Sequence, residues 1–215
     1  MVKIAPSILS ADFSNLQKEI KDIDKAGADY IHIDIMDGHY VPNITFGPNI
    51  VNAVRQHTKK ILDIHLMISP VKKYVEEFIK AGADIISFHP EADNNPQDIL
   101  NLLKENNCKA GIAIHPKIKI SQIIKYLDLI DIIVVMTVIP GFAEQKFMND
   151  QALKISLLNE IKKTKNLKFE IEVDGGINNK NCILCKKKGA NVLVAGSYIF
   201  NSSNKKYKYL IDSLK

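Results

Sequence analysis

The sequence predicts an α/β protein folded as a (β/α)8 barrel (TIM barrel), and three observations lead to this prediction. The chain has 215 residues with 46% hydrophobic content, enough for one sizeable core. Buried-strand patterns alternate with helical patterns along its length. No Gly/Ser-rich, Pro-rich or single-charge run interrupts this alternation, so we expect one domain over residues 1–215. A doubly wound open sheet is the alternative that the pattern allows.

Three segments share one design, a helix that ends at a glycine and a buried strand that follows it. They are Ala26–Asp34, Ala81–His89 and Gly189–Gly196. Their spacing approximates whole multiples of roughly 27 residues, the size of one strand plus one helix. The chain length therefore accommodates about eight such units.

Eight strands are expected, with helical patterns filling every gap between them. The first helical pattern spaces Leu16, Ile20 and Ile23 along one face, with Ser14 as its expected N-cap. In a fold of this kind the chemistry lies at the C-terminal ends of the strands. The strands are expected at Ile4–Leu9, Tyr30–Asp34, Ile61–Leu66, Ile85–His89, Ala110–Ile114, Ile132–Thr137, Phe169–Asp174 and Val192–Ala195.

The second strand has a polar and an apolar face. Side chains alternate in a strand, so His32, Asp34 and Met36 point one way and the three isoleucines between and before them point the other. The apolar face suggests that helices pack against it. The imidazole and the carboxylate can reach one metal ion or one substrate, or can form a buried hydrogen-bonded pair.

Polar residues occur at the same end of two further strands. The third strand, I-L-D-I-H-L-M, places His65 on the face of Asp63, and the seventh, F-E-I-E-V-D-G-G, ends with Asp174 on the face of two glutamates. Two imidazoles and two carboxylates suit a divalent transition metal such as zinc or iron. The four are His32, Asp34, His65 and Asp174, whereas structural or surface roles are expected for His39, His57, His89 and His115.

Glycine-containing loops follow the last two strands, at Gly175-Gly176 and at Gly196-Ser197. Barrels commonly hold a phosphate there, because glycines let backbone amides approach an anion and a short helix that follows directs its positive end at it. Ordinary turn glycines are the alternative. A third loop, Val138–Gln145, leaves the sixth strand and is a candidate lid.

Composition narrows the class of partner and the compartment. The net charge of +5 and pI near 8.9 suit either nucleic acid or a phosphorylated small molecule. The first residues lack the apolar run of a secretory signal and the longest apolar runs are too short to cross a bilayer, so we expect a cytoplasmic protein without a membrane partner. Cys182 and Cys185 form a C-x-x-C in a segment that reads as helix, and we expect no metal or redox role for them.

Long motifs in order give the chain a resemblance to the ribulose-phosphate 3-epimerase (pentulose-5-phosphate 3-epimerase) family. They are A-P-S-I-L-S-A-D-F, H-I-D-I-M-D-G-H-Y-V-P-N-I-T-F-G-P, D-I-H-L-M, F-H-P-E, V-M-T-V-x-P-G-F and E-V-D-G-G-I. The resemblance implies a (β/α)8 barrel isomerase of the pentose phosphate pathway that interconverts D-ribulose 5-phosphate and D-xylulose 5-phosphate. It implies one divalent metal ion, zinc or iron with manganese or cobalt as alternatives, held by His32, Asp34, His65 and Asp174.

The same resemblance implies that Asp34 and Asp174 are the catalytic acid and base. Inverting C3 beside a C2 ketone removes the α-proton from one face and returns a proton on the other, so two carboxylates must flank the substrate. The enediolate intermediate carries negative charge on O2, and a metal ion there stabilises it.

Further residues are assigned to the substrate by the resemblance, and we also expect a homo-oligomer and no nucleic-acid partner. One group contacts the sugar, one holds the phosphate, one belongs to the lid, and three methionines form an apolar patch beneath the enediolate or simply fill the core. They are Ser7 and His65 for the sugar, Gly175, Gly176, Gly196 and Ser197 for the phosphate, Gly141, Phe142, Ala143 and Glu144 for the lid, and Met36, Met67 and Met136 for the patch.

Four positions depart from the family pattern. Ala143 and Glu144 stand where the family usually has two glycines, and a carboxylate near a phosphate is repelled unless it points to solvent. Ile139 and His115 replace residues that are usually polar, an asparagine in the second case.

Three alternatives remain. The lid alanine also resembles allulose-6-phosphate 3-epimerases, which act on a six-carbon ketose phosphate, although Phe46-Gly47-Pro48 and Asp174–Ile177 follow the pentulose pattern. A non-catalytic basic barrel that binds nucleic acid is disfavoured by the intact histidines and aspartates. A decarboxylase of the orotidine-phosphate type needs a lysine interleaved with aspartate, and Asp34–Asp37 contains none.

Overall fold

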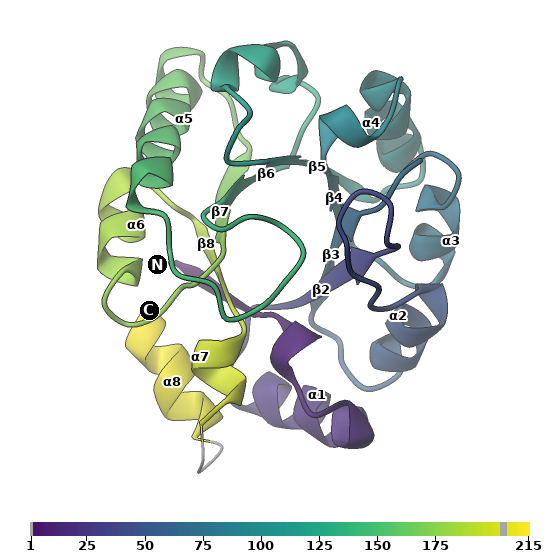
Figure 1. Ribbon diagram of the computed structural model, residues 1–215, viewed down its shortest axis with the longest axis vertical. Coiled ribbons are helices and arrows are strands. Elements are labelled where there is room, and N and C mark those ends of the chain that lie inside the picture. Colours follow the sequence, from purple (N-terminus) through teal and green to yellow (C-terminus); the bar gives the residue numbers. More distant parts are fainter. Residues whose placement is uncertain (1, 203–205) are drawn as a thin grey trace.

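Eight parallel strands form a nearly closed barrel in the computed structural model, which describes residues 2–202 and 206–215 (Figure 1). Neighbouring strands are hydrogen-bonded in the order β1-β8-β7-β6-β5-β4-β3-β2, and a bridge between Ser7 and His32 joins the two ends. The predicted (β/α)8 barrel is confirmed, and the open sheet is wrong. The strands are β1 (Lys3–Pro6), β2 (Tyr30–Met36), β3 (Ile61–Met67), β4 (Ile85–Phe88), β5 (Lys109–Ile114), β6 (Ile132–Met136), β7 (Glu170–Asp174) and β8 (Val192–Ala195).

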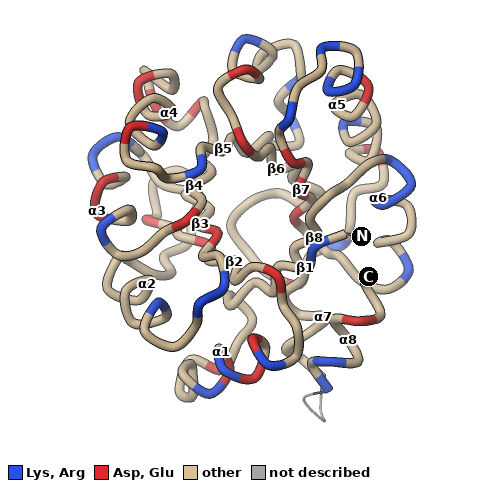
Figure 2. Tube along the Cα trace, turned by 180° about the vertical axis from the view of Figure 1, so that it is seen from behind, with Lys and Arg blue, Asp and Glu red and all other residues tan. Residues whose placement is uncertain are grey.

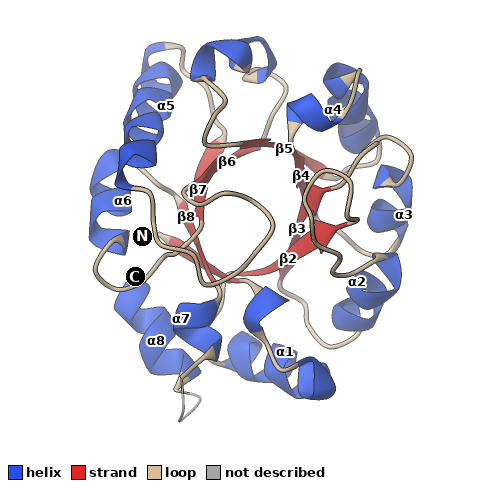
Figure 3. Ribbon diagram, in the orientation of Figure 1, coloured by secondary structure: helices blue, strands red, loops and turns tan. Residues whose placement is uncertain are grey.

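Helices surround the strands on the outside of the barrel (Figure 3). The predicted outer face of β2 lies in the main core, where Ile31, Ile33 and Ile35 are buried together with Ile20 and Ile23 of the first helix. None of the described helices is both long and apolar enough to cross a membrane. The helices are α1 (Leu16–Lys25), α2 (Pro48–Arg55), α3 (Val75–Lys80), α4 (Pro96–Glu105), α5 (Ala152–Thr164), α6 (Cys182–Lys188), α7 (Ser197–Phe200) and α8 (Tyr207–Leu214).

The predicted repeats are confirmed by the backbone at their glycines. Gly27, Gly82 and Gly189 have φ values of +92°, +106° and +107°, in the left-handed region that ends helices. Each is followed within a few residues by β2, β4 or β8. A side chain at Gly189 would also collide with Asn159, because an added Cβ would lie 2.4 Å from its amide nitrogen.

Two predictions near the start of the chain are wrong. The first strand ends at Pro6 rather than Leu9, because the chain turns into a 3-10 helix at Ile8–Ser10. The N-cap of α1 is Asn15 and not Ser14. The hydroxyl of Ser14 instead donates to the Asp12 carboxylate, which also accepts from the Ser14 backbone amide and caps a 3-10 turn.

The expectation of a helix in every gap fails between β5 and β6. The described residues there form two 3-10 helices, Ile120–Gln122 and Ile124–Tyr126, and no α-helix. The buried residues Ile120, Ile123, Leu127 and Ile130 have the spacing of an amphipathic helix, so the pattern alone does not distinguish the two helix types.

The barrel interior changes character along its axis. At the N-terminal end of the strands, Lys3, Tyr30 and Glu170 bond to one another, above an apolar cluster that includes Ala5 and Ile132. Polar residues then occupy the inner positions nearer the C-terminal ends. Figure 2 views the molecule from behind and shows acidic and basic residues interspersed over the outer helices and loops.

Candidate active site

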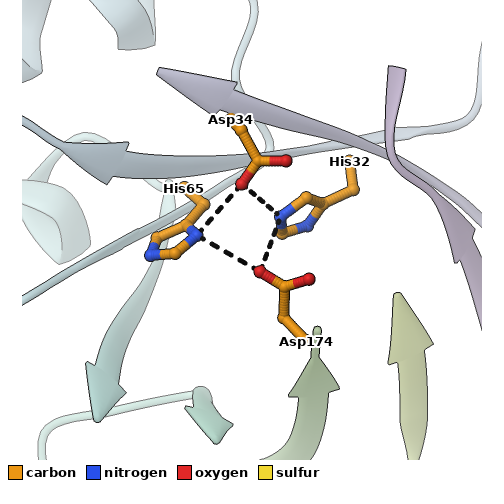
Figure 4. Close-up of side chains that lie close together, drawn as sticks. All are labelled: His32, Asp34, His65 and Asp174. Carbon is orange, nitrogen blue, oxygen red and sulfur yellow. Dashed lines mark hydrogen bonds and ion pairs between the residues drawn. The ribbon is translucent and has the colours of Figure 1, made fainter. Parts of the chain in front are cut away.

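Four predicted residues meet at the C-terminal ends of three strands. His32 and Asp34 come from β2, His65 from β3 and Asp174 from β7, and one ligand atom of each lies within 4.8 Å of the others (Figure 4). Oδ1 of Asp34 lies 3.3 Å from Nε2 of His32 and 3.3 Å from Nδ1 of His65. Oδ2 of Asp174 lies 3.9 Å and 3.7 Å from the same two nitrogens.

These separations match what a divalent metal needs. Bonds of about 2.1 Å in a tetrahedron put donor atoms about 3.4 Å apart, and two imidazole nitrogens with two carboxylate oxygens suit zinc or another transition metal. This cluster, made of described residues, fits the predicted metal site.

The hydrogen bonds of His32 leave one ring nitrogen free for such an ion. Its Nδ1 lies 2.7 Å from Oδ2 of the buried Asp63, and because a carboxylate accepts, Nδ1 carries the proton. Its buried Nε2, which faces the cluster, makes no hydrogen bond to any described residue. A ligating histidine is typically held by such a carboxylate, and this is the observation that most directly supports the metal site.

His65 is held by a second histidine. Its Nε2 lies 3.0 Å from Nε2 of His89, a fully buried ring whose pKa burial lowers to about 4. His89 is therefore neutral near pH 7 and can accept a proton from His65. Burial opposes a charge on His65, but Asp174 and Asp34, which face its Nδ1, outweigh burial and raise the pKa of His65 to about 9. A metal ion at Nδ1 would therefore displace a proton.

The carboxylates around the cluster differ in their electrostatics. Burial opposes the charge of Asp34, but His32 and His65 outweigh it and lower its pKa. Burial and the neighbouring Asp63 raise the pKa of Glu172 to about 8. The sequence placed Asp63 and Glu172 on the inner face but assigned them no role.

A pocket opens directly above the cluster. Asp34 and Asp174 form part of its floor, and all the residues predicted to contact the substrate line it except His65, which lies beneath. Six further described residues line it: Val138, Pro140 and Gln145 of the predicted lid loop, and Leu9, Ser10 and Val194, to which the sequence gave no role. Leu9 and Ser10 lie within the A-P-S-I-L-S-A-D-F motif, and Val194 lies two residues before Gly196.

The sugar side of the pocket combines a hydroxyl with sulfur. Ser7 donates from Oγ to Oδ2 of Asp34 at 2.6 Å, which orients this carboxylate. The side chains of Met36, Met67 and Met136 line the pocket and are each 2% exposed. They are buried residues that also form part of the pocket wall.

The predicted phosphate loops lie together at the pocket edge. Gly175 and Gly176 have φ values of +124° and +65°, and an added Cβ would lie 2.6 Å from Val138 at the first and 2.8 Å from the backbone of Phe147 at the second. These glycines therefore allow the lid loop to pack against their backbone. Gly196 and Ser197 line the same pocket, and α7 begins at Ser197.

The loop Val138–Gln145 crosses the open end of the barrel (Figure 1). Its base is closed by a backbone hydrogen bond from Met148 to Thr137, whose hydroxyl donates to the carbonyl of Gly175 at 2.6 Å. Asn43 donates to the carbonyl of Gly141 at 2.7 Å. The loop is therefore tied to both β7 and the segment after β2.

Of the remaining predicted histidines, His39 is exposed and His115 makes a local turn. Nδ1 of His115 accepts from the backbone amide of Lys117, a bond that an asparagine side chain at this position can also make. The departure from the family pattern is thus conservative. Cys182 and Cys185 are buried on α6 and unpaired, and burial raises the pKa of Cys185 to about 12, which makes it unreactive.

Comparison with known proteins agrees with these motifs. The model of the ribulose-phosphate 3 epimerase family matches residues 3–200. This chain belongs to that family. It is 48% identical to the ribulose-phosphate 3-epimerase of Bacillus subtilis over 207 residues, 96% of this chain and 95% of that one. It is also 48% identical to the enzyme of that name from Synechocystis, over 94% of this chain and 89% of that one.

Family membership makes the chain an epimerase, a type of isomerase. Similarity to solved structures adds the fold alone. The 3-keto-L-gulonate-6-phosphate decarboxylase of Vibrio cholerae aligns with a TM-score of 0.71 at 15% identity, over 100% of this chain and 94% of that one. The family thus shares its barrel with enzymes of different chemistry, and the side chains at the strand ends distinguish it.

Proposed function

We propose that the protein is a metal-dependent epimerase that interconverts D-ribulose 5-phosphate and D-xylulose 5-phosphate at C3, a step of the pentose phosphate pathway. One observation carries the proposal: two carboxylates, from β2 and β7, reach the same histidine cluster from opposite sides under one pocket (Figure 4). Inversion at a carbon next to a ketone needs an acid and a base on two faces of the substrate. Named relatives at 48% identity support the choice of substrate.

Each aspartate divides its two oxygens between tasks. Oδ1 of Asp34 and Oδ2 of Asp174 face the imidazoles, which leaves the other oxygen of each for the substrate. One aspartate takes the C3 proton to form an enediolate and the other returns a proton to the opposite face. Ser7 keeps the reacting oxygen of Asp34 in place by its hydrogen bond.

His32, Asp34, His65 and Asp174 would hold one divalent ion. When bound, it supplies Lewis-acid stabilisation of the negative charge that develops on the C2 oxygen. Asp63 and His89 fix the two imidazoles so that a ring nitrogen of each faces the cluster. Zinc and iron fit the donor set best, with manganese or cobalt as alternatives.

Backbone groups would hold the phosphate. Backbone amides and one hydroxyl are available at the edge of the pocket, just after the C-terminal ends of β7 and β8. They belong to Gly175, Gly176, Gly196 and Ser197. The methionines beneath the sugar exclude water from the enediolate. The lid residues Gly141 to Glu144 would close over the phosphate.

A coupled assay for xylulose 5-phosphate formed from ribulose 5-phosphate tests this function, run before and after treatment with a chelator. We expect rapid turnover that chelation abolishes and that an added divalent ion restores. Allulose 6-phosphate is assayed alongside, because turnover of the hexulose alone would move the assignment to the six-carbon epimerases. Activity on neither substrate would refute the proposal.

Four further properties accompany this function. We propose a cytoplasmic enzyme that acts as a homo-oligomer and has no nucleic-acid partner, and that residues 1–215 form one domain. Size measurement in solution and a salt-dependent binding assay with duplex DNA would test the second and third.

A further inference from the structure

No described residue that lines the pocket has a positive charge to compensate a phosphate. Among the described residues that line it, every charged side chain is a carboxylate: Asp34, Glu144 and Asp174. Among the described lining residues, a phosphate finds only uncharged donors, such as backbone amides and hydroxyls. Any free carboxylate nearby would oppose it, because two like charges a few ångström apart repel by several kcal/mol outside bulk water.

Glu144 is the carboxylate that lies in the lid beside the proposed phosphate subsite. It lies in the lid, lines the pocket together with Gly176 and Ser197, and has a φ of +62° in the left-handed region that favours glycine. A non-glycine residue holds that backbone only where its surroundings stabilise it. Contacts of Glu144 with its neighbours therefore hold this part of the lid in its conformation.

Asn201 provides that partner from outside the pocket. Its Nδ2 donates to Oε1 of Glu144 at 2.7 Å. Asn201 directly follows α7, whose first residue, Ser197, belongs to the expected phosphate subsite, yet Asn201 itself does not line the pocket. Instead it borders a second depression with Tyr198 and Asn178, a depression that Glu144, Gly176 and Ser197 also line. The bond thus holds the carboxylate of Glu144 at Asn201, a residue that borders the second depression and not the pocket, and it ties the lid to the end of α7.

We propose that Asn201 is a positioning residue for phosphate binding: it holds Glu144 out of the phosphate subsite and the lid against α7. The inference rests on the proposed function, because it concerns the phosphate of the same substrate. Asn201 touches neither substrate nor metal. It acts only through Glu144, so its contribution disappears when Glu144 carries no charge.

A double-mutant cycle tests this dependence. Asn201→Ala should raise KM for ribulose 5-phosphate and weaken competitive inhibition by inorganic phosphate, each roughly three- to tenfold, with kcat within twofold. Asn201→Asp, which turns a second carboxylate toward Glu144, should have a larger effect. Glu144→Gln keeps a hydrogen-bond acceptor for Asn201 and should bind phosphate as well as the parent or better.

The decisive comparison is Asn201→Ala in the Glu144→Gln background, where it should change KM and phosphate affinity less than twofold. An equal loss in both backgrounds would overturn the proposal, since Asn201 would then act without Glu144. A fall in kcat with unchanged KM would overturn it as well.

Phosphate affinity is also measured without substrate, by titrating inorganic phosphate and following amide chemical shifts. The four proteins of the cycle are the parent, Asn201→Ala, Glu144→Gln and the double variant. This separates the two proposals. If ribulose 5-phosphate is not turned over but the cycle in phosphate affinity holds, the proposed function fails and the role of Asn201 stands. If turnover is normal but Asn201→Ala weakens phosphate binding equally in both backgrounds, the role of Asn201 is refuted and the proposed function stands. The same conclusion follows if turnover is normal and the parent binds no phosphate.

Discussion

Polar residues occupy both ends of the barrel interior, but they are paired with one another at the N-terminal end and only partly paired at the C-terminal end. At the N-terminal end, Glu170 of β7 bonds to the ammonium group of Lys3 and to the hydroxyl of Tyr30. At the C-terminal end of the same strand, Asp174 faces two imidazoles at 3.7–3.9 Å, and Nε2 of His32 makes no hydrogen bond among the described residues. Glu172 lies between them, buried and without a hydrogen bond to described residues.

The difference lies in which groups the polar atoms meet. A polar cluster whose donors and acceptors are matched stabilises the fold, while one with an unmatched buried nitrogen is suited to an ion or a substrate. β7 therefore changes from a stabilising role to a chemical one over five residues. Three kinds of experiment sharpen this comparison.

The largest effect is expected at the two proposed bases. Asp34→Asn and Asp174→Asn should each lower kcat by roughly 10³-fold or more, because each removes a proton-transfer group and a metal donor. Circular dichroism and the urea midpoint should show a folded protein. Asp98→Asn, which breaks an exposed ion pair with Lys72, is the matched control and should leave kcat unchanged. Near-native turnover in either active-site variant would contradict the two-base mechanism.

A smaller effect is expected one layer below. Asp63→Asn replaces the carboxylate that holds Nδ1 of His32 by a weaker acceptor, and should weaken metal affinity roughly tenfold. Competition with a chromophoric chelator measures this change without reference to activity. Metal affinity equal to that of the parent would show that Asp63 only fills the interior.

The smallest effect is expected at the N-terminal end. Glu170→Gln should lower the free energy of unfolding by about 1 kcal/mol, since it weakens bonds to Tyr30 and to a Lys3 side chain that is 39% exposed and therefore screened by water. Urea denaturation measures the change, and kcat should stay within twofold. A large loss of kcat with unchanged stability would reverse the roles assigned to the two ends.

The same variant should alter the dependence of stability on pH. Burial disfavours the charge of Glu170, but bonds from Lys3 and Tyr30 outweigh it and lower its pKa from 4.5. A group whose pKa is lower in the folded state stabilises the protein above its unfolded pKa, and this contribution is lost as the pH falls through the folded value. The difference in unfolding free energy between parent and Glu170→Gln should therefore shrink between about pH 6 and about pH 3. A constant difference would contradict this linkage.

Much of the fold and of the candidate site could be predicted from the sequence because both depend on local pattern. Alternation along β2, β3 and β7 decides which side chains face inward, and parallel strands bring their C-terminal ends to one edge. His32, Asp34, His65 and Asp174 follow from those two rules. The glycines that end helices could also be predicted, because the left-handed backbone conformation at a helix end is a local property of one residue.

What the sequence could not predict depends on contacts between distant segments. The pairing of His65 with His89, the bond of Asn43 to the lid and the bond of Asn201 to Glu144 join residues 24, 98 and 57 positions apart. The N-cap of α1 and the 3-10 connection before β6 are a different case, because competing local hydrogen bonds and packing against the core decide them.

The sequence by itself thus determined the barrel, the inward faces of its strands and the four clustered residues, because periodicity and strand direction are properties of the chain alone. Tertiary structure decided which group meets each ring nitrogen of the two histidines, which carboxyl has a raised pKa and which partner the carboxylate of Glu144 binds. Those properties depend on the neighbours that folding supplies, and hydrogen bonds and desolvation act only over a few ångström.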